Sequence, residues 1–134
     1  MKRKAEQLIA LTAEEEKLFE FLLDVVEQNK TLTTLRVAGG WVRDKLLGRF
    51  SDDIDIVLDN MTGAEFADLI NKYETDHGHK KHHVGIIKAN PDQSKHLETA
   101  TIHLGIGWVD FVNLRSETYA KHSRIPQMVS VQRS

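Results

Sequence analysis

Two aspartates, Asp53 and Asp55, have the residue type and the spacing of a metal site. Apolar residues Ile54 and Ile56 alternate with them, which predicts a strand over 54–58 that carries both carboxylates on one face. Parallel carboxylates repel one another unless a cation lies between them, and Mg²⁺ prefers such oxygen ligands. This is the arrangement of a phosphoryl-transfer centre, although an Asp-x-Asp pair alone is more often structural or solvated.

A glycine pair and an arginine upstream supply a second part of the same site. Gly39 and Gly40 follow a predicted strand at 33–38, and a short helix is predicted at 41–47. Backbone N–H groups approach a phosphate closely at glycine, and the start of the helix adds positive partial charge. Arg43 adds a charge-assisted contact to a triphosphate. A glycine pair alone is typical of a tight turn, but together with paired carboxylates it indicates a site for a metal and a nucleoside triphosphate.

The hydrophobic pattern elsewhere predicts the elements that position these residues. Thr12 and Glu15 form a capping-box pattern before apolar residues at helical spacing. The pattern recurs at Thr62 and Glu65, ahead of a helix of about three turns. We expect helices at 13–29, 41–47 and after residue 62, and strands at 33–38, 54–58, 84–87, 97–104 and 108–114, the last two joined by a hairpin at 105–107. This order predicts an α+β fold, a mixed sheet with helices packed on one face.

Two separated parts of the chain carry a specific resemblance. The segments 36–48 and 53–55 resemble the signature of class II CCA-adding and poly(A) polymerase head domains, which belong to the DNA polymerase beta-like nucleotidyltransferase superfamily. The segments 93–101 and 109–117 resemble the eukaryotic CCA-adding enzymes. The resemblance covers residues 35–128 and implies a tRNA nucleotidyltransferase that moves CMP and AMP from CTP and ATP to the 3′ end of tRNA, with Mg²⁺.

The resemblance also implies roles for particular residues. Asp53 and Asp55 would hold Mg²⁺. Asp110 would be a third catalytic carboxylate, although it fits an ordinary strand-end acid equally well. Arg115 would contact nucleotide or phosphate, but in one regular strand it falls on the face opposite Asp110, so a bend must intervene. The nucleotide-binding set is then Gly39, Gly40, Arg43 and Arg115.

The family pattern is lost after about residue 128. The resemblance implies a further head strand, a base-reading neck and tRNA-holding helices, and the segment 129–134 matches none of them. We therefore expect an incomplete head with an unpaired sheet edge, lower stability and possible self-association. One alternative is a truncated, non-catalytic nucleotide- or RNA-binding fragment. Another is a minimal nucleotidyltransferase that modifies a different RNA or a protein hydroxyl.

Composition limits the remaining possibilities. The 134 residues are expected to form one head domain, with a helical part at 1–30, a catalytic core at 35–115 and an irregular tail at 116–134. A formal net charge of −2 predicts that most tRNA-gripping surface lies elsewhere. No apolar run spans a membrane, and the acidic residues near the start argue against a targeting segment. We expect an intracellular, cytoplasmic protein with possible mitochondrial or nuclear pools.

Three further features have more ordinary interpretations. The histidine-rich stretch 75–83 is interpreted as a solvated loop rather than a zinc site, and as a candidate cover for the active site. Trp41 is expected to pack beside the helix start, with base stacking as the alternative. His103 is expected at the surface of its strand.

Overall fold

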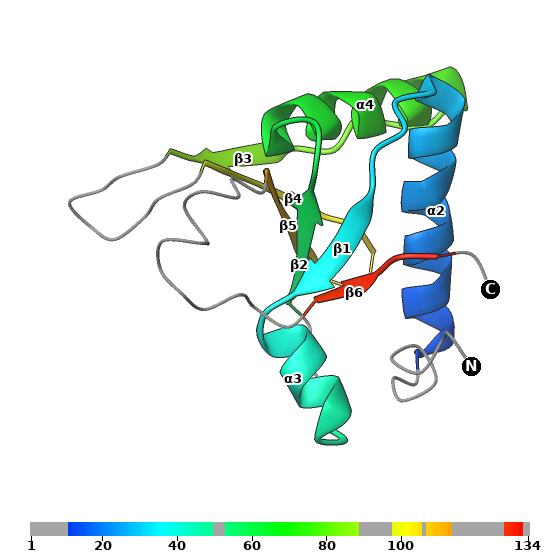
Figure 1. Ribbon diagram of the computed structural model, residues 1–134. Helices are drawn as coiled ribbons and strands as arrows, with labels where there is room; N and C mark the ends of the chain where they lie inside the picture. Colours follow the sequence, from blue (N-terminus) through cyan, green and yellow to red (C-terminus); the bar gives the residue numbers. More distant parts are fainter. Residues whose placement is uncertain (1–10, 50–52, 89–97, 106, 114–127, 133–134) are drawn as a thin grey trace.

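In a computed structural model, the described residues form a mixed sheet of six strands together with three helices (Figure 1). The structure describes residues 11–49, 53–88, 98–105, 107–113 and 128–132. The helices are α2 (Ala13–Asn29), α3 (Gly40–Leu46) and α4 (Gly63–Asp76). The strands are β1 (Leu35–Ala38), β2 (Ile54–Leu58), β3 (Val84–Ile87), β4 (Thr99–His103), β5 (Trp108–Asn113) and β6 (Met128–Ser130). The α+β prediction is confirmed.

The strand order across the sheet is β3-β4-β5-β2-β1-β6. β2 and β5 are parallel, and every other neighbouring pair is antiparallel. The parallel pair lies in the middle of the sheet, so the strand that holds Asp55 is flanked on both sides. The predicted hairpin between β4 and β5 is confirmed, since these strands pair in antiparallel register and are adjacent in the chain.

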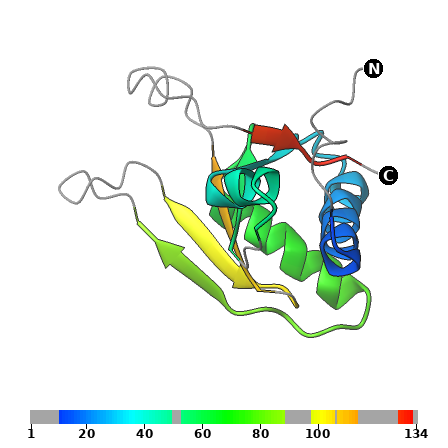
Figure 2. The same ribbon diagram turned by 90° about the horizontal axis from the view of Figure 1, so that it is seen from below.

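Helices α2 and α4 cover one face of the sheet (Figure 2). The inward residues of the strands alternate with outward ones, as in β5, where Val109 and Phe111 are fully buried. Phe66 of α4 meets Phe111 with ring centroids 5.2 Å apart. Of the residues that the structure describes, the main core members are apolar side chains of α2, α4 and the inward faces of β1, β2, β4 and β5.

Local capping signals set the starts of both long helices. Thr12 accepts the backbone N–H of Glu15 at 3.1 Å, and the Glu15 side chain accepts the N–H of Thr12 at 2.9 Å. The same reciprocal pair joins Thr62 and Glu65 at 3.0 and 2.9 Å. The capping boxes are confirmed. The helix after Thr62 is longer than expected, with 14 residues.

The prediction of an irregular tail is wrong for residues 128–130. This segment forms β6, which pairs antiparallel with β1. The main chain of Val131 then donates a hydrogen bond to Leu35 O at 2.8 Å, and Val131 joins the core. The backbone groups on that side of β1 are therefore paired, so the missing-strand argument for an exposed edge does not apply to β1. Self-association stays a prediction.

Among the helices of the described residues, none has the length and apolar character needed to cross a membrane.

Candidate active site

Asp55 and Asp110 face each other on neighbouring parallel strands. Asp55 of β2 is in register with Asp110 of β5, so both carboxyl groups lie on the sheet face opposite α4. The two side chains are close enough for Asp110 to raise the pKa of Asp55. Thr101 of β4, the next partner in register, donates its hydroxyl to Asp110 Oδ1 at 2.8 Å. The sequence placed Asp110 only loosely, and the register puts it in the centre of the site.

The clustered carboxylates repel further negative charge on this face of the sheet. The pKa of Asp55 is raised from its ordinary 3.8 to about 6, first by burial and then by the negative charges of Asp110 and Asp53. Asp53 lies just before β2 and is exposed, and its charge still reaches Asp55. A cation beside these groups would lower that pKa and remove the repulsion.

Gly39 closes one side of Asp55. Its φ of +77° lies in the left-handed region, which favours glycine. A Cβ built on Gly39 would lie 2.9 Å from Asp55 Oδ2, closer than side-chain atoms normally approach. Ala38 is the register partner of Asp55, so the turn leaves β1 directly beside the carboxylate. The glycine is thus required by both its backbone and its neighbour.

Arg43 folds back over the same turn. A Cβ on Gly40 would lie 3.2 Å from Arg43 Nη2, which places the guanidinium against the glycine backbone. The Arg43 side chain is largely exposed, and its nearest ion-pair contact is Nε to Asp44 Oδ1 at 3.4 Å. An exposed pair of this length contributes little, so the guanidinium is available to an anionic ligand at the turn.

A buried network fixes the helix that carries Arg43. Glu15 of α2 is only 2% exposed and accepts hydrogen bonds from Trp41 Nε1 at 3.1 Å and Lys45 Nζ at 2.6 Å. Trp41 also meets Phe19 edge to face, at 5.8 Å between centroids. The prediction that Trp41 packs is confirmed. The anchoring role of Glu15 is absent from the sequence interpretation, which assigned it only to a helix cap.

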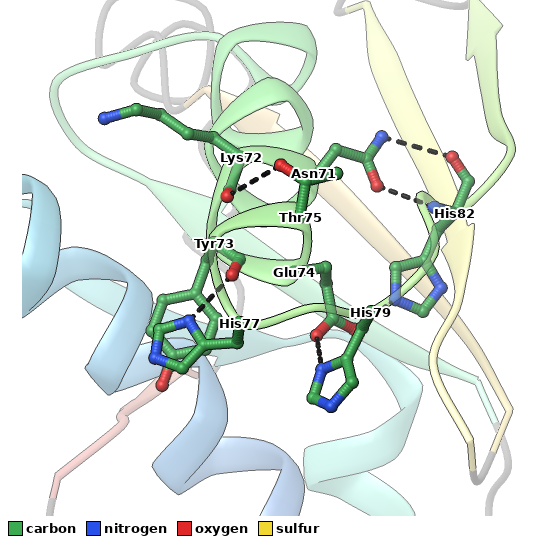
Figure 3. Close-up of polar contacts among 8 residues, drawn as sticks. All are labelled: Asn71, Lys72, Tyr73, Glu74, Thr75, His77, His79 and His82. Atoms are coloured by element: carbon green, nitrogen blue, oxygen red, sulfur yellow. Dashed lines mark hydrogen bonds and ion pairs between the residues drawn. The ribbon is translucent and has the colours of Figure 1, made fainter.

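The histidine-rich stretch is largely exposed and irregular after α4, as the interpretation as a solvated loop predicts, and two of its histidines are in addition fastened to α4 (Figure 3). His79 and His82 contact the two carboxylate oxygens of Glu74 at 3.0 and 2.6 Å. Burial raises the pKa of Glu74, but the hydrogen bonds from His82 and His79 outweigh burial and leave that pKa below its ordinary value. Asn71 bonds the His82 main chain in both directions, at 2.7 and 3.1 Å.

These histidines line a cavity away from the carboxylates. The cavity of about 440 Å³ lies between α2, α4 and the turn after β4, and residues such as Phe21, Glu74 and Leu104 form its walls. None of the three site aspartates lines it. The role of the stretch as a cover for the active site therefore receives no support from these contacts.

The carboxylates on the sheet face opposite α4 suit a magnesium ion that is completed by waters and phosphates, and they do not form a complete metal site made of protein ligands alone. In the described part of the chain, no group of three or more His, Cys, Asp or Glu side chains is arranged to hold a metal. Mg²⁺ is usually held by one or two carboxylates, with waters and substrate phosphates completing its shell. Asp53 and Asp55 are carboxylates of this kind, and burial and the neighbouring carboxylates raise the pKa of Asp55, which a cation between them would counteract.

The remaining predicted site residue, Arg115, lies outside the described residues. Its contact with nucleotide stays a prediction. The structure therefore brings together six of the seven predicted site residues around one end of β2: Gly39, Gly40, Arg43, Asp53, Asp55 and Asp110.

A nucleotidyltransferase head is the class of domain in which such a sheet, glycine turn and carboxylate pair occur together. The Poly A polymerase head domain family matches residues 35–128, and the chain belongs to that family. This match begins at the first residue of β1 and ends at the first residue of β6. It therefore includes every site residue named above. Nucleotidyltransferases of this family generally use a divalent metal ion.

Two yeast relatives match most of the chain. The mitochondrial CCA tRNA nucleotidyltransferase of Candida glabrata is 48% identical over 128 residues, which are 88% of this chain and 24% of the relative. The enzyme of the same name from Saccharomyces cerevisiae is 54% identical over 99 residues, which are 71% of this chain and 18% of the relative. The chain thus spans about a quarter or less of the length of these relatives.

Solved structures agree on the fold. A Thermotoga maritima CCA-adding enzyme in complex with tRNA superposes with a TM-score of 0.56 and 26% identity, over 79% of this chain and 22% of that one. A CCA-adding enzyme in complex with ATP gives a TM-score of 0.59 at 22% identity, over 90% of this chain and 28% of that one, a likeness of fold.

Proposed function

We propose that this chain is the catalytic head of a tRNA nucleotidyltransferase of the CCA-adding type, and that residues 1–134 form one head domain. The observation that carries the proposal is the Asp55–Asp110 pair beside the Gly39 turn. The names of the yeast relatives and of the similar structures support tRNA as acceptor and CTP and ATP as donors.

The reaction we propose is nucleotide transfer onto the 3′ end of tRNA. A terminal ribose hydroxyl attacks the α-phosphorus of CTP or ATP and forms a new P–O bond. The bond between the α-phosphorus and the bridging oxygen breaks, pyrophosphate leaves, and the hydroxyl proton passes to a base or to water. Because this chemistry needs positioning and charge stabilisation more than covalent help, a few carboxylates, main-chain groups and one arginine suffice.

Each residue then has a distinct task. Asp53 and Asp55 would hold Mg²⁺, which would supply charge stabilisation at the phosphoryl oxygens. Asp110, the third carboxylate, lies beside Asp55 in register and is itself oriented by Thr101. The Gly39 and Gly40 main chain lets the triphosphate approach, and the Arg43 guanidinium over this turn balances its charge.

The experiment has a binding readout and a transfer readout. Calorimetry measures affinity for ATP and CTP with and without Mg²⁺, and labelled CTP and ATP are offered with tRNA that lacks its 3′ CCA. We expect Mg²⁺-dependent binding by the chain, and about tenfold or greater loss in the Asp53→Ala, Asp55→Ala double variant. The matched control is Asp68→Ala, which removes an exposed carboxylate from α4.

The two readouts separate the main proposal from its alternative. Extension of tRNA by the chain, abolished in the double variant, supports a catalytic head. Metal-dependent binding without extension favours the alternative of a nucleotide-binding head that does not itself transfer. Unchanged binding and extension in the folded double variant would overturn the assignment of the carboxylates. Labelling of a different RNA or a protein, with tRNA left unmodified, would overturn the substrate.

The proposed substrate, tRNA, suggests in which compartments of the cell the protein works. Both yeast relatives carry "mitochondrial" in their names. Since tRNA is processed in more than one compartment, we propose an intracellular location with cytoplasmic and mitochondrial pools. Fractionation of cells that express the tagged full-length protein tests this, and recovery only from the medium would contradict it.

A further inference from the structure

An exposed aromatic side chain lies on the same strand face as the carboxylates. Trp108 is the first residue of β5 and is 52% exposed, whereas its neighbour Val109 is fully buried. Side chains two residues apart on a strand share a face and lie about 7 Å apart along it. Trp108 therefore shares the open face with Asp110. A tryptophan of this exposure contributes little to the core.

His103 holds the indole from the neighbouring strand. His103 of β4 is the register partner of Trp108, and the two rings meet at 84° with centroids 5.0 Å apart. The next partners on this face are Thr101 and Asp110, joined by their 2.8 Å hydrogen bond. The aromatic pair His103–Trp108 thus lies next to the polar pair Thr101–Asp110 on the same face. The edge-to-face contact with His103 restricts the orientation of the indole.

The parallel register relates the indole to the metal-binding carboxylates. Ile54 is in register with Val109, and Asp55 with Asp110. If this register is extended by one residue toward the start of both strands, Asp53 comes opposite Trp108. The exposed ring therefore borders the carboxylate site on the side of Asp53. In nucleotide and single-stranded RNA sites, aromatic rings in this situation stack on bases, because every base has a π-face.

We propose that Trp108, oriented by His103, is a stacking platform for a nucleobase of the substrates that bind at the carboxylate site. This rests on the proposed function, since it needs a nucleotide phosphate near Asp53 and Asp55. The shared chemistry is a purine or pyrimidine ring, which two substrates carry: the incoming nucleoside triphosphate and the 3′-terminal nucleotide of the RNA. The experiment distinguishes these sources.

Tryptophan fluorescence reports this stacking directly. The chain has two tryptophans, and Trp41 is only 2% exposed, so ligand-dependent quenching reports mainly on Trp108. The chain is titrated in Mg²⁺ with ATP, with CTP, with inorganic triphosphate and with a short RNA that ends in a 3′ hydroxyl. We expect quenching by a ligand that carries a base and none by inorganic triphosphate.

Variants measure the contribution to affinity. Trp108→Ala should weaken binding of the quenching ligand about tenfold because it removes the stacking surface for the base, whereas Trp108→Phe should retain most of the affinity. Ile86→Ala, which removes an exposed apolar side chain from β3, is the matched control and should leave affinity unchanged. Inorganic triphosphate should bind all variants equally, as calorimetry reports without the indole.

The fluorescence and affinity results decide whether Trp108 stacks on a base, and on which base. Quenching by ATP or CTP assigns the incoming base, and quenching by RNA alone assigns the 3′-terminal base. Absence of quenching by every base-bearing ligand, or equal affinity for Trp108→Ala and the parent chain, overturns the platform. In that case, retained Mg²⁺-dependent triphosphate binding leaves the proposed function standing, and its loss removes both.

Discussion

Lys45 Nζ lies 2.6 Å from Glu15 Oε1, with only 9% and 2% of the two side chains exposed. This pair joins the first turn of α2 to α3, and α3 carries Arg43 between Trp41 and Lys45. Lys45 also lies over the Trp41 ring, 5.4 Å from its centroid. The position of the arginine above the glycine turn therefore depends on a glutamate far away in the sequence.

Glu15→Gln should destabilise the fold substantially. Glutamine keeps the shape of the side chain but leaves the Lys45 ammonium buried without a carboxylate, a change that costs about 3 kcal/mol in comparable sites. Urea denaturation measures the free energy of unfolding. Glu16→Gln, one residue along on the exposed side of α2, should change it by less than about 0.5 kcal/mol. Equal unfolding midpoints for both variants would show that the buried pair contributes nothing.

Gly39→Ala should weaken nucleotide binding through a contact with Asp55. The new Cβ would meet Asp55 Oδ2 at 2.9 Å, and the backbone conformation of Gly39, with φ +77° and ψ −149°, is essentially restricted to glycine and adds about 1–3 kcal/mol of strain. Gly48 has nearly the same φ, +74°, with no atom within 4 Å of its added Cβ, so Gly48→Ala carries the strain alone. We expect Gly39→Ala to lose more stability than Gly48→Ala, because of the ψ of −149° at Gly39, and only Gly39→Ala to lose affinity for ATP with Mg²⁺, about tenfold. Equal affinities in the two variants would contradict the proposed closeness of the turn to the ligand.

The raised pKa of Asp55 predicts a stability change with pH. Below the ordinary value of 3.8, Asp55 is protonated in both the folded and the unfolded chain, so it carries no penalty. As the pH rises from about 4 to about 6, the unfolded chain releases this proton while the folded chain retains it, and stability falls. Above about 6 the full penalty remains.

Asp55→Asn removes this penalty. In the presence of a metal chelator, the variant should be more stable than the parent chain at pH 7.5 by about 1 kcal/mol, a value reduced because part of the carboxyl contacts water. At pH 4 the two should unfold at the same midpoint. Thermal denaturation at both pH values measures the difference, and a constant offset across the range would show that Asp55 titrates normally.

The features predicted correctly from the sequence depend on local signals. The capping pairs at Thr12 and Thr62 act within one turn, and α2 has the predicted bounds of 13–29. The alternation that places Asp55 and Asp110 on one face is likewise a property of each strand alone. Their register is not, because it is set by how β2 and β5 pair across the core.

The features missed are those created by contacts between distant segments. β6 is a three-residue strand without a pattern of its own, and pairing with β1 makes it a strand. Glu15 has an ordinary capping position, and only the arrival of Trp41 and Lys45 from α3 makes it a buried anchor. The histidines at 79 and 82 lie in the exposed loop that the sequence predicts, but their contacts with Glu74 were not predicted because Glu74 comes from the helix before them.

At Gly63, helix propensity and packing against the sheet predict opposite effects of a substitution by alanine. It lies in the first turn of α4, with a backbone conformation that any residue adopts, so helix propensity alone predicts that alanine stabilises it by about 1 kcal/mol. A Cβ there would lie 2.1 Å from Phe111 O, 2.9 Å from Phe111 C and 3.1 Å from Ala100 N. These are main-chain atoms of β5 and β4, so no side-chain rotation relieves the clash.

Gly63→Ala should therefore push α4 away from the sheet and destabilise the fold by about 3 kcal/mol or more, because overpacking against main chain outweighs the gain in propensity. Gly85→Ala in β3 is the control, since its added Cβ has only Thr101 O nearby, at 3.9 Å. We expect Gly85→Ala to unfold within about 1 kcal/mol of the parent chain. If Gly63→Ala proved as stable as Gly85→Ala in urea, α4 would not rest on β5 as closely as described. The Phe66–Phe111 contact that depends on this approach would then have to be longer than 5.2 Å.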